Sequence, residues 1–158
     1  MEAFPAGPEP EYHPEARPKP ESVKTAVNLI WVGVAISVLS TLISFFMLDD
    51  IIDELMATDT SGISEDAARA SAVFGIVISV IIGIALAALF AHFIGKGANW
   101  ARIVYTVLTA IGILLGVLGL GSSQPFLLLL LGLASLAVSI ATLYFLYRPE
   151  SNAYFKAS

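Results

Sequence analysis

The chain contains no cysteine, only two histidines, and few charged residues for its length. Without cysteine it forms no disulfide and offers no thiolate to a substrate or a metal. Charged residues are 13% of the 158 residues, whereas about 25% is usual in a soluble domain. No HExxH zinc motif, Ser/His/Asp arrangement or basic stripe is present. The zinc protease, serine hydrolase and nucleic-acid-binding classes therefore have no support.

Charge is missing from four apolar stretches. None of them contains Asp, Glu, Lys or Arg, and each can supply the roughly 20 helical residues that cross a bilayer core. They cover residues 25–48, 70–95, 103–123 and 125–147. The sequence therefore predicts an all-α integral membrane protein, with an antiparallel bundle of four transmembrane helices over residues 24–148.

Basic residues are distributed unevenly among the connections between these stretches. Seven of the eight precede the first stretch, separate the second from the third, or follow the fourth. The opposite side has Arg69 alone, in the acidic loop 49–69. Because short cytoplasmic loops are enriched in Lys and Arg, we expect both termini to be cytoplasmic and loop 49–69 to be external. We expect a multi-pass protein of the inner (plasma) membrane.

The external loop carries two helix signals. Residues 49–56, "DDIIDELM", keep helical periodicity, so we expect them to continue the first helix or to lie at the membrane interface. Ser64 is followed by Glu65 and Asp66, and this order predicts a capped start for the second helix. The loop lacks the D-x-[DN]-x-[DN]-G spacing of calcium loops, and we expect neither a metal nor another cofactor.

The two chain ends differ in composition. Residues 1–23 contain six of the eight prolines and predict a disordered, Pro-rich cytoplasmic tail. That tail is either a solvated leader or a docking strip for a proline-recognising partner. Residues 149–158 predict a short cytoplasmic tail, because Pro149 should end the last helix.

The turn between the second and third stretches, "GKGANWAR" at residues 95–102, superficially resembles a phosphate loop. That motif requires G-x-x-x-x-G-K-[ST], and here Lys96 is followed by Gly97. The residues have structural uses instead. Gly95 or Gly97 can end the second helix in the left-handed conformation, and Asn99 can cap the third.

Small residues recur at helical spacing along the spans, most regularly on the second. Such residues let membrane helices approach closely, because lipid gives apolar side chains little reason to leave it. The pattern predicts either packing within the four-helix bundle or a homodimer interface or docking groove for another membrane protein. The candidate packing positions are Gly33, Ser37, Gly75, Ser79, Gly83, Ala87, Gly112 and Gly116.

Aromatic and basic residues are placed so that the turn and the carboxyl tail can meet. If the tail packs against the turn, the two form one cytoplasmic surface whose ligands are anionic lipid headgroups or a cytoplasmic protein. The candidate residues are Trp100, Arg102, Tyr147, Arg148, Tyr154 and Phe155.

Ionisable groups at membrane depth are what proton relays and ion paths require, and the stretches offer only His92. We therefore expect a non-enzymatic scaffold or accessory subunit that packs with itself or with another membrane protein. The alternative is a small oligomeric transporter or channel lined by small and hydroxyl residues. A membrane enzyme is a third possibility that would need His92 or the acidic loop to be catalytic. Membrane lipids are expected contacts, and nucleic acid is not.

Two short segments carry a resemblance to a known group of proteins. "NWARIVYTVL" at residues 99–108, after a glycine–lysine turn, and "LYRPESNAYF" at residues 146–155 resemble segments of small, uncharacterised four-span membrane proteins of bacteria, of the actinobacterial type. The resemblance covers residues 24–155. It implies four spans and a Pro-rich cytoplasmic leader, and it implies no catalytic residue.

Overall fold

The computed structural model describes residues 18–58, 62–120 and 125–156. Within these ranges the chain is helical, with no strand. The helices are α1 (Glu21–Phe46), α2 (Leu48–Thr58), α3 (Glu65–Gly95), α4 (Asn99–Gly119), α5 (Phe126–Leu146) and α6 (Pro149–Lys156). Residues 1–17 of the predicted disordered tail and residues 121–124 lie outside the described part.

Four of these helices, α1, α3, α4 and α5, are long and apolar enough to cross a membrane. The all-α, four-span prediction is confirmed, and the chain is a multi-pass membrane protein. Most of their large apolar side chains are exposed, as expected of helices whose solvent is lipid. The acidic and basic residues lie outside the apolar stretches, so charge is found only toward the ends of these helices.

Helix boundaries follow local chemistry in most places. The hydroxyl of Ser64 accepts a hydrogen bond from the amide of Ala67 at 3.3 Å, so the predicted cap of α3 is confirmed. The acidic segment forms a separate helix, α2, after a break at Met47. Helix α1 begins at Glu21, earlier than the residue 25 expected from apolar composition.

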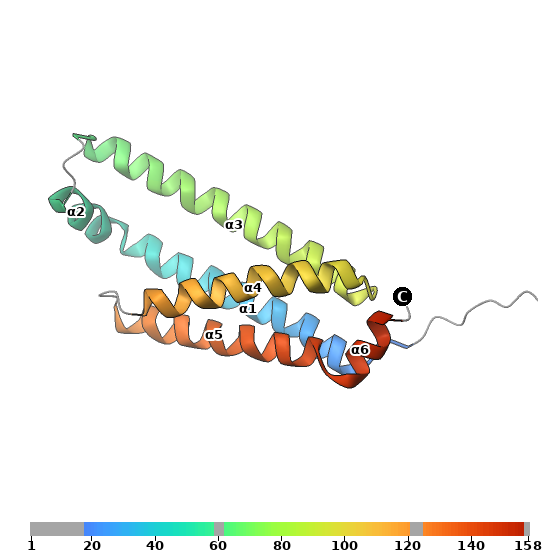
Figure 1. The fold of residues 1–158 in the computed structure, drawn as a ribbon. Coiled ribbons are helices and arrows are strands. Elements are labelled where there is room, and N and C mark those ends of the chain that lie inside the picture. The colour runs from blue at the N-terminus through green and yellow to red at the C-terminus, as the bar shows by residue number, and fades with distance from the viewer. Residues whose placement is uncertain (1–17, 59–61, 121–124, 157–158) are drawn as a thin grey trace, which may run out of the picture.

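The four spans form an antiparallel bundle in which some helix pairs pack more extensively than others (Figure 1). Helix α1 packs along α5 and, less extensively, along α3. Helix α4 packs against both α3 and α5, but α3 diverges from α4 and α5 toward α2. We call the end with the α3–α4 turn and α6 the turn end, and the end with α2 the loop end.

The core lies at the turn end. Nine buried apolar residues form one cluster there, contributed by all four spans and α6, namely Val23, Ala26, Ile30, Phe90, Ala91, Ile94, Ala101, Leu146 and Phe155. The other buried apolar residues of the described part, Leu48 and Ile52, belong to α2. The spans therefore share a core at one end only.

Candidate functional site

The α3–α4 turn at the turn end is shaped by Gly97. Its φ of 85° is the left-handed conformation that glycine adopts without steric cost, and its amide donates to the carbonyl of Ile94 at 3.0 Å. One of the two glycines predicted to end the helix therefore does so. The predicted Asn99 cap is wrong, because Ala98 occupies the N-cap position and no side chain caps α4. The turn is closed instead by backbone hydrogen bonds, such as the one from the Gly97 amide to the Ile94 carbonyl.

Helix α6 begins at Pro149, where the sequence suggested an end. Proline suits the first position of a helix, because its missing N–H would have no partner there. Residues 149–156, expected as a short tail, therefore form a helix that contacts α1 and α5. Sequence reasoning treated Pro149 only as a stop for α5 and missed the helix that it starts.

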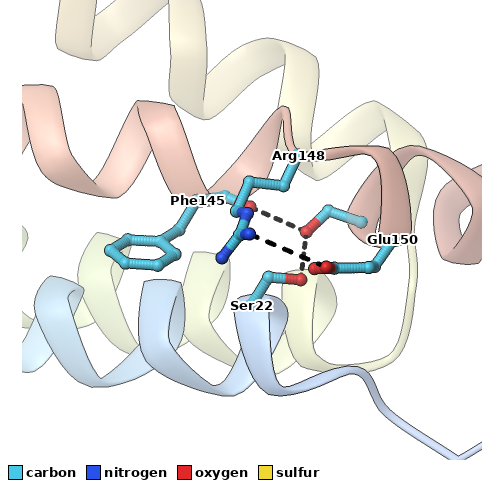
Figure 2. A network of polar contacts seen from close by, with 5 residues as sticks. Ser22, Phe145, Arg148 and Glu150 are labelled. Atoms are coloured by element: carbon cyan, nitrogen blue, oxygen red, sulfur yellow. Dashed lines mark hydrogen bonds and ion pairs between the residues drawn. The ribbon is translucent and has the colours of Figure 1, made fainter.

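A buried pair of serines joins α6 to the first turn of α1 (Figure 2). Ser151 and Ser22 are buried, and their hydroxyl oxygens lie 2.8 Å apart. The Ser151 oxygen also lies 2.7 Å from the carbonyl oxygen of Phe145. Beside this network, Arg148 approaches Glu150 at 3.8 Å. The sequence carried no signal for the serine pair, because its members are 129 positions apart.

Arg102, from the first turn of α4, is enclosed by residues of α6 and the end of α5. Its guanidinium carbon lies 4.8 Å from the ring centroid of Tyr147 and 4.7 Å from that of Phe155, within the range of cation–π attraction. One guanidinium nitrogen donates to the Asn152 side-chain oxygen at 2.7 Å. We call Arg102, Tyr147, Asn152 and Phe155 the Arg102 clamp.

Two further hydrogen bonds lie beside the clamp. The Tyr154 hydroxyl donates to the carbonyl of Gly95 at the end of α3, at 3.1 Å. The hydroxyls of Thr106 and Tyr147 lie 3.1 Å apart. Helix α6 thus makes specific polar contacts with α1, α3, α4 and α5. These contacts attach the α3–α4 turn to the carboxyl-terminal segment, of which α6 is part.

The six residues predicted as one surface divide into two groups. The tail and turn do meet, but Phe155 is 2% exposed, while Arg102 and Tyr154 are partly buried. Trp100 and Tyr147 are 51% and 44% exposed, and the Arg148 side chain is 40% exposed. Trp100 packs on Phe93, with ring centroids 5.1 Å apart. Half of the set is therefore internal structure, and the other half remains available to a ligand.

The predicted packing glycines also differ in what they face. A Cβ on Gly33 would lie 3.8 Å from Val138, and one on Gly116 would lie 3.0 Å from Leu136, both on α5. The same addition at Gly75, Gly83 or Gly112 would meet nothing within 4 Å. The first two glycines thus sit where helices approach closely. The other three border open space.

A cleft occupies the space between α1, α3 and α5. Its volume is about 420 Å³, and Tyr105 of α4 contributes to its wall. Four of the predicted packing positions besides Gly33 line it, namely Ser37, Ser79, Gly83 and Ala87. Three small residues of α3, Ser79, Gly83 and Ala87, therefore border a cavity.

The remaining candidates for chemistry are dispersed. His92 is exposed and packs edge-on against Phe93, with ring centroids 5.4 Å apart. In the loop region, Arg69 of α3 pairs with Asp49 of α2. Within the described ranges, no three His, Asp or Glu side chains gather in a group that could hold a metal ion.

Comparisons with known proteins add no function to this geometry. No family model, no curated protein and no solved structure matches the chain. The resemblance to four-span bacterial proteins stays a prediction.

Proposed function

We propose that the protein is a non-enzymatic scaffold or accessory subunit of the inner (plasma) membrane. Its turn end binds an acidic segment of another membrane protein. The observation that carries this proposal is the attachment of the α3–α4 turn to α6 through the Arg102 clamp and the Tyr154–Gly95 hydrogen bond. These contacts make the turn end a preorganised platform, which lowers the ordering cost of binding.

The charge of the turn end supports an acidic partner. In the described part, this end carries six basic and two acidic residues, whereas the loop end carries one basic and six acidic residues. Both turn-end acids lie near a basic residue, Glu21 at 2.7 Å from Lys24 and Glu150 at 3.8 Å from Arg148. Lys96 and Lys156 are exposed. Charge complementarity of this kind steers association and selects partners.

Trp100 supplies an apolar anchor beside this charge. Tryptophan and arginine are the residues that most often dominate binding energy at interfaces, and Trp100 is half exposed on the turn next to Lys96. Its packing on Phe93 fixes one face of the ring and leaves the rest free for a partner. An acidic segment with an adjacent apolar side chain matches this arrangement.

The test is purification of the full chain from its membrane in mild detergent, with mass spectrometry of what accompanies it. We expect a stoichiometric partner with the unmodified chain and with Trp31→Ala, a matched control because Trp31 is 45% exposed on α1. Trp100→Ala and Lys96→Glu should each lose that partner, and its retention should fall as salt is raised. Equal recovery with all four chains contradicts the proposal.

A small oligomeric transporter is the second candidate, and the cleft is the observation that favours it. Hydroxyls of Ser37, Thr41 and Ser79 line it together with small residues. Recovery of copies of this chain alone, with solute flux in protein-containing liposomes, would replace the scaffold proposal with this one. Absence of flux from well-folded protein would exclude it.

A further inference from the structure

The cleft between α1, α3 and α5 combines apolar side chains with hydroxyls. Serine and threonine side chains from three helices border it, and the described lining contains no Asp, Glu, Lys, Arg or His. Ser37, Ser79 and Gly83 are exposed, so the cleft is open to the surrounding lipid. Its volume of about 420 Å³ falls in the range of about 300–1,000 Å³ typical of small-molecule sites.

Two of the hydroxyls in this cleft, those of Thr41 and Ser79, have already used their protons. Thr41 donates to the carbonyl of Ser37 at 2.9 Å, and Ser79 donates to the carbonyl of Gly75. A hydroxyl has one proton and two lone pairs. Both side chains are therefore left with acceptor capacity, which calls for an occupant that donates a hydrogen bond.

The occupant's donor group should be uncharged. A cation would have to leave water for a site without a carboxylate, at a cost that buried charges avoid by pairing. An alcohol satisfies the acceptors at a much smaller desolvation cost. Since Thr41 lies five residues before the end of α1, or roughly 8 Å along the helix, the acceptor is close to the loop-end membrane surface. The polar group of a lipid can reach that depth.

We propose that this cleft binds a neutral lipid with a free hydroxyl, of the diacylglycerol or long-chain alcohol class. The hydroxyl donates to Thr41 or Ser79, and the apolar chain lies along the cleft beside Gly83 and Ala87. A Cβ at Gly83 would meet nothing within 4 Å, so the space beside this residue is open to the chain. This inference concerns a site apart from the turn end, so it holds or fails independently of the proposed scaffold function.

The test uses two photoreactive probes in lipid nanodiscs that contain the full chain. One is a long-chain primary alcohol with a diazirine in its chain, and the other is its methyl ether, which has the same body without a donor. Labelled peptides are mapped by mass spectrometry. We expect the alcohol to label residues 33–41 and 79–87 several-fold more than the ether does.

Two pairs of variants make the result specific. The double variant Thr41→Val, Ser79→Ala removes both acceptors and should reduce alcohol labelling to the level of the ether. Ser71→Ala is its control, since Ser71 on the same helix also donates to its own backbone, the Ala67 carbonyl at 2.8 Å, but does not line the cleft. Gly83→Val should reduce labelling by both probes, because the added side chain occupies part of the cleft. Ala85→Val, exposed on α3 and outside the lining, should not.

Three results would overturn the proposal. Equal labelling by alcohol and ether would mean that only the apolar chain is bound. Equal behaviour of the Thr41→Val, Ser79→Ala double variant and of Ser71→Ala, with unchanged thermal stability, would remove the assigned acceptors. Crosslinks between two copies of the chain at residues 79–87, with loss of probe labelling, would assign the cleft to self-association.

Discussion

At the turn end, nine apolar side chains are buried together, whereas toward the loop end the same four spans bury none. Both halves contain small residues at helical spacing. The turn end has α6, with Phe155 in the core and polar contacts to each span. The loop end has α2, whose buried residues Leu48 and Ile52 do not belong to that core. Lipid is as apolar as the helices, so hydrophobicity alone does not draw them together. The difference teaches that small residues permit pairs of helices to approach, as at Gly116 and Leu136, while the core shared by all four spans forms where α6 adds side chains and hydrogen bonds.

The largest expected difference in the free energy of unfolding is between substitutions of two phenylalanines at opposite ends of the bundle. Phe155 is 2% exposed and Phe126, at the loop-end start of α5, is 73% exposed. Phe155→Ala leaves a cavity and should lower the free energy of unfolding by about 3–5 kcal/mol. Phe126→Ala should change it by less than about 0.5 kcal/mol. Denaturation by SDS in mixed micelles measures both, and equal losses would contradict the contrast between the ends.

Two arginines provide the next comparison. Arg102→Gln removes both cation–π contacts and the charged hydrogen bond to Asn152, so we expect a loss of about 2–3 kcal/mol in unfolding free energy. Arg69→Gln breaks an exposed ion pair with Asp49, which is worth about 1 kcal/mol at most. The same denaturation assay at low and high salt should show salt dependence for the Arg69 effect only. A larger loss for Arg69→Gln than for Arg102→Gln would rule out the clamp as the stronger contact.

The smallest expected difference in the free energy of unfolding is between the removal of two serine hydroxyls, one buried and one exposed. Ser151→Ala removes buried contacts with Ser22 and the Phe145 carbonyl, which should cost about 1–2 kcal/mol because groups that remain buried lose a partner. Ser71→Ala removes an exposed bond to its own helix and should cost less than about 0.5 kcal/mol. Indistinguishable denaturation curves for the two variants would show that the serine network contributes no stability at the turn end.

The sequence predicted the helices better than their arrangement. Composition and caps were sufficient for four spans and for the start of α3 at Ser64, because these depend on neighbouring residues. Pro149 was ambiguous, since proline both ends one helix and suits the first turn of the next. Asn99 is a good capping residue in general, yet it lies one position inside α4.

The candidate site was less predictable because it depends on distant parts of the chain. Trp100, Arg102 and the carboxyl segment could be placed at one end from topology. Their division into buried and exposed members follows from contacts with Ser22, Gly95 and Asn152, which no local pattern encodes. The cleft is equally non-local, since α1, α3, α4 and α5 each contribute to its wall.

The four spans share a core at the turn end, whereas α3 diverges from α4 and α5 toward the loop end. Because the chain has no cysteine, spin labels can be attached to introduced cysteine pairs without background. Exposed positions 96 and 156 report on the turn end, and exposed positions 70 and 118 report on α3 and α4 near the loop end. Double electron–electron resonance in nanodiscs should give a narrow distance distribution for the first pair and a broader one for the second. A loop-end distribution as narrow as the turn-end distribution would contradict the account.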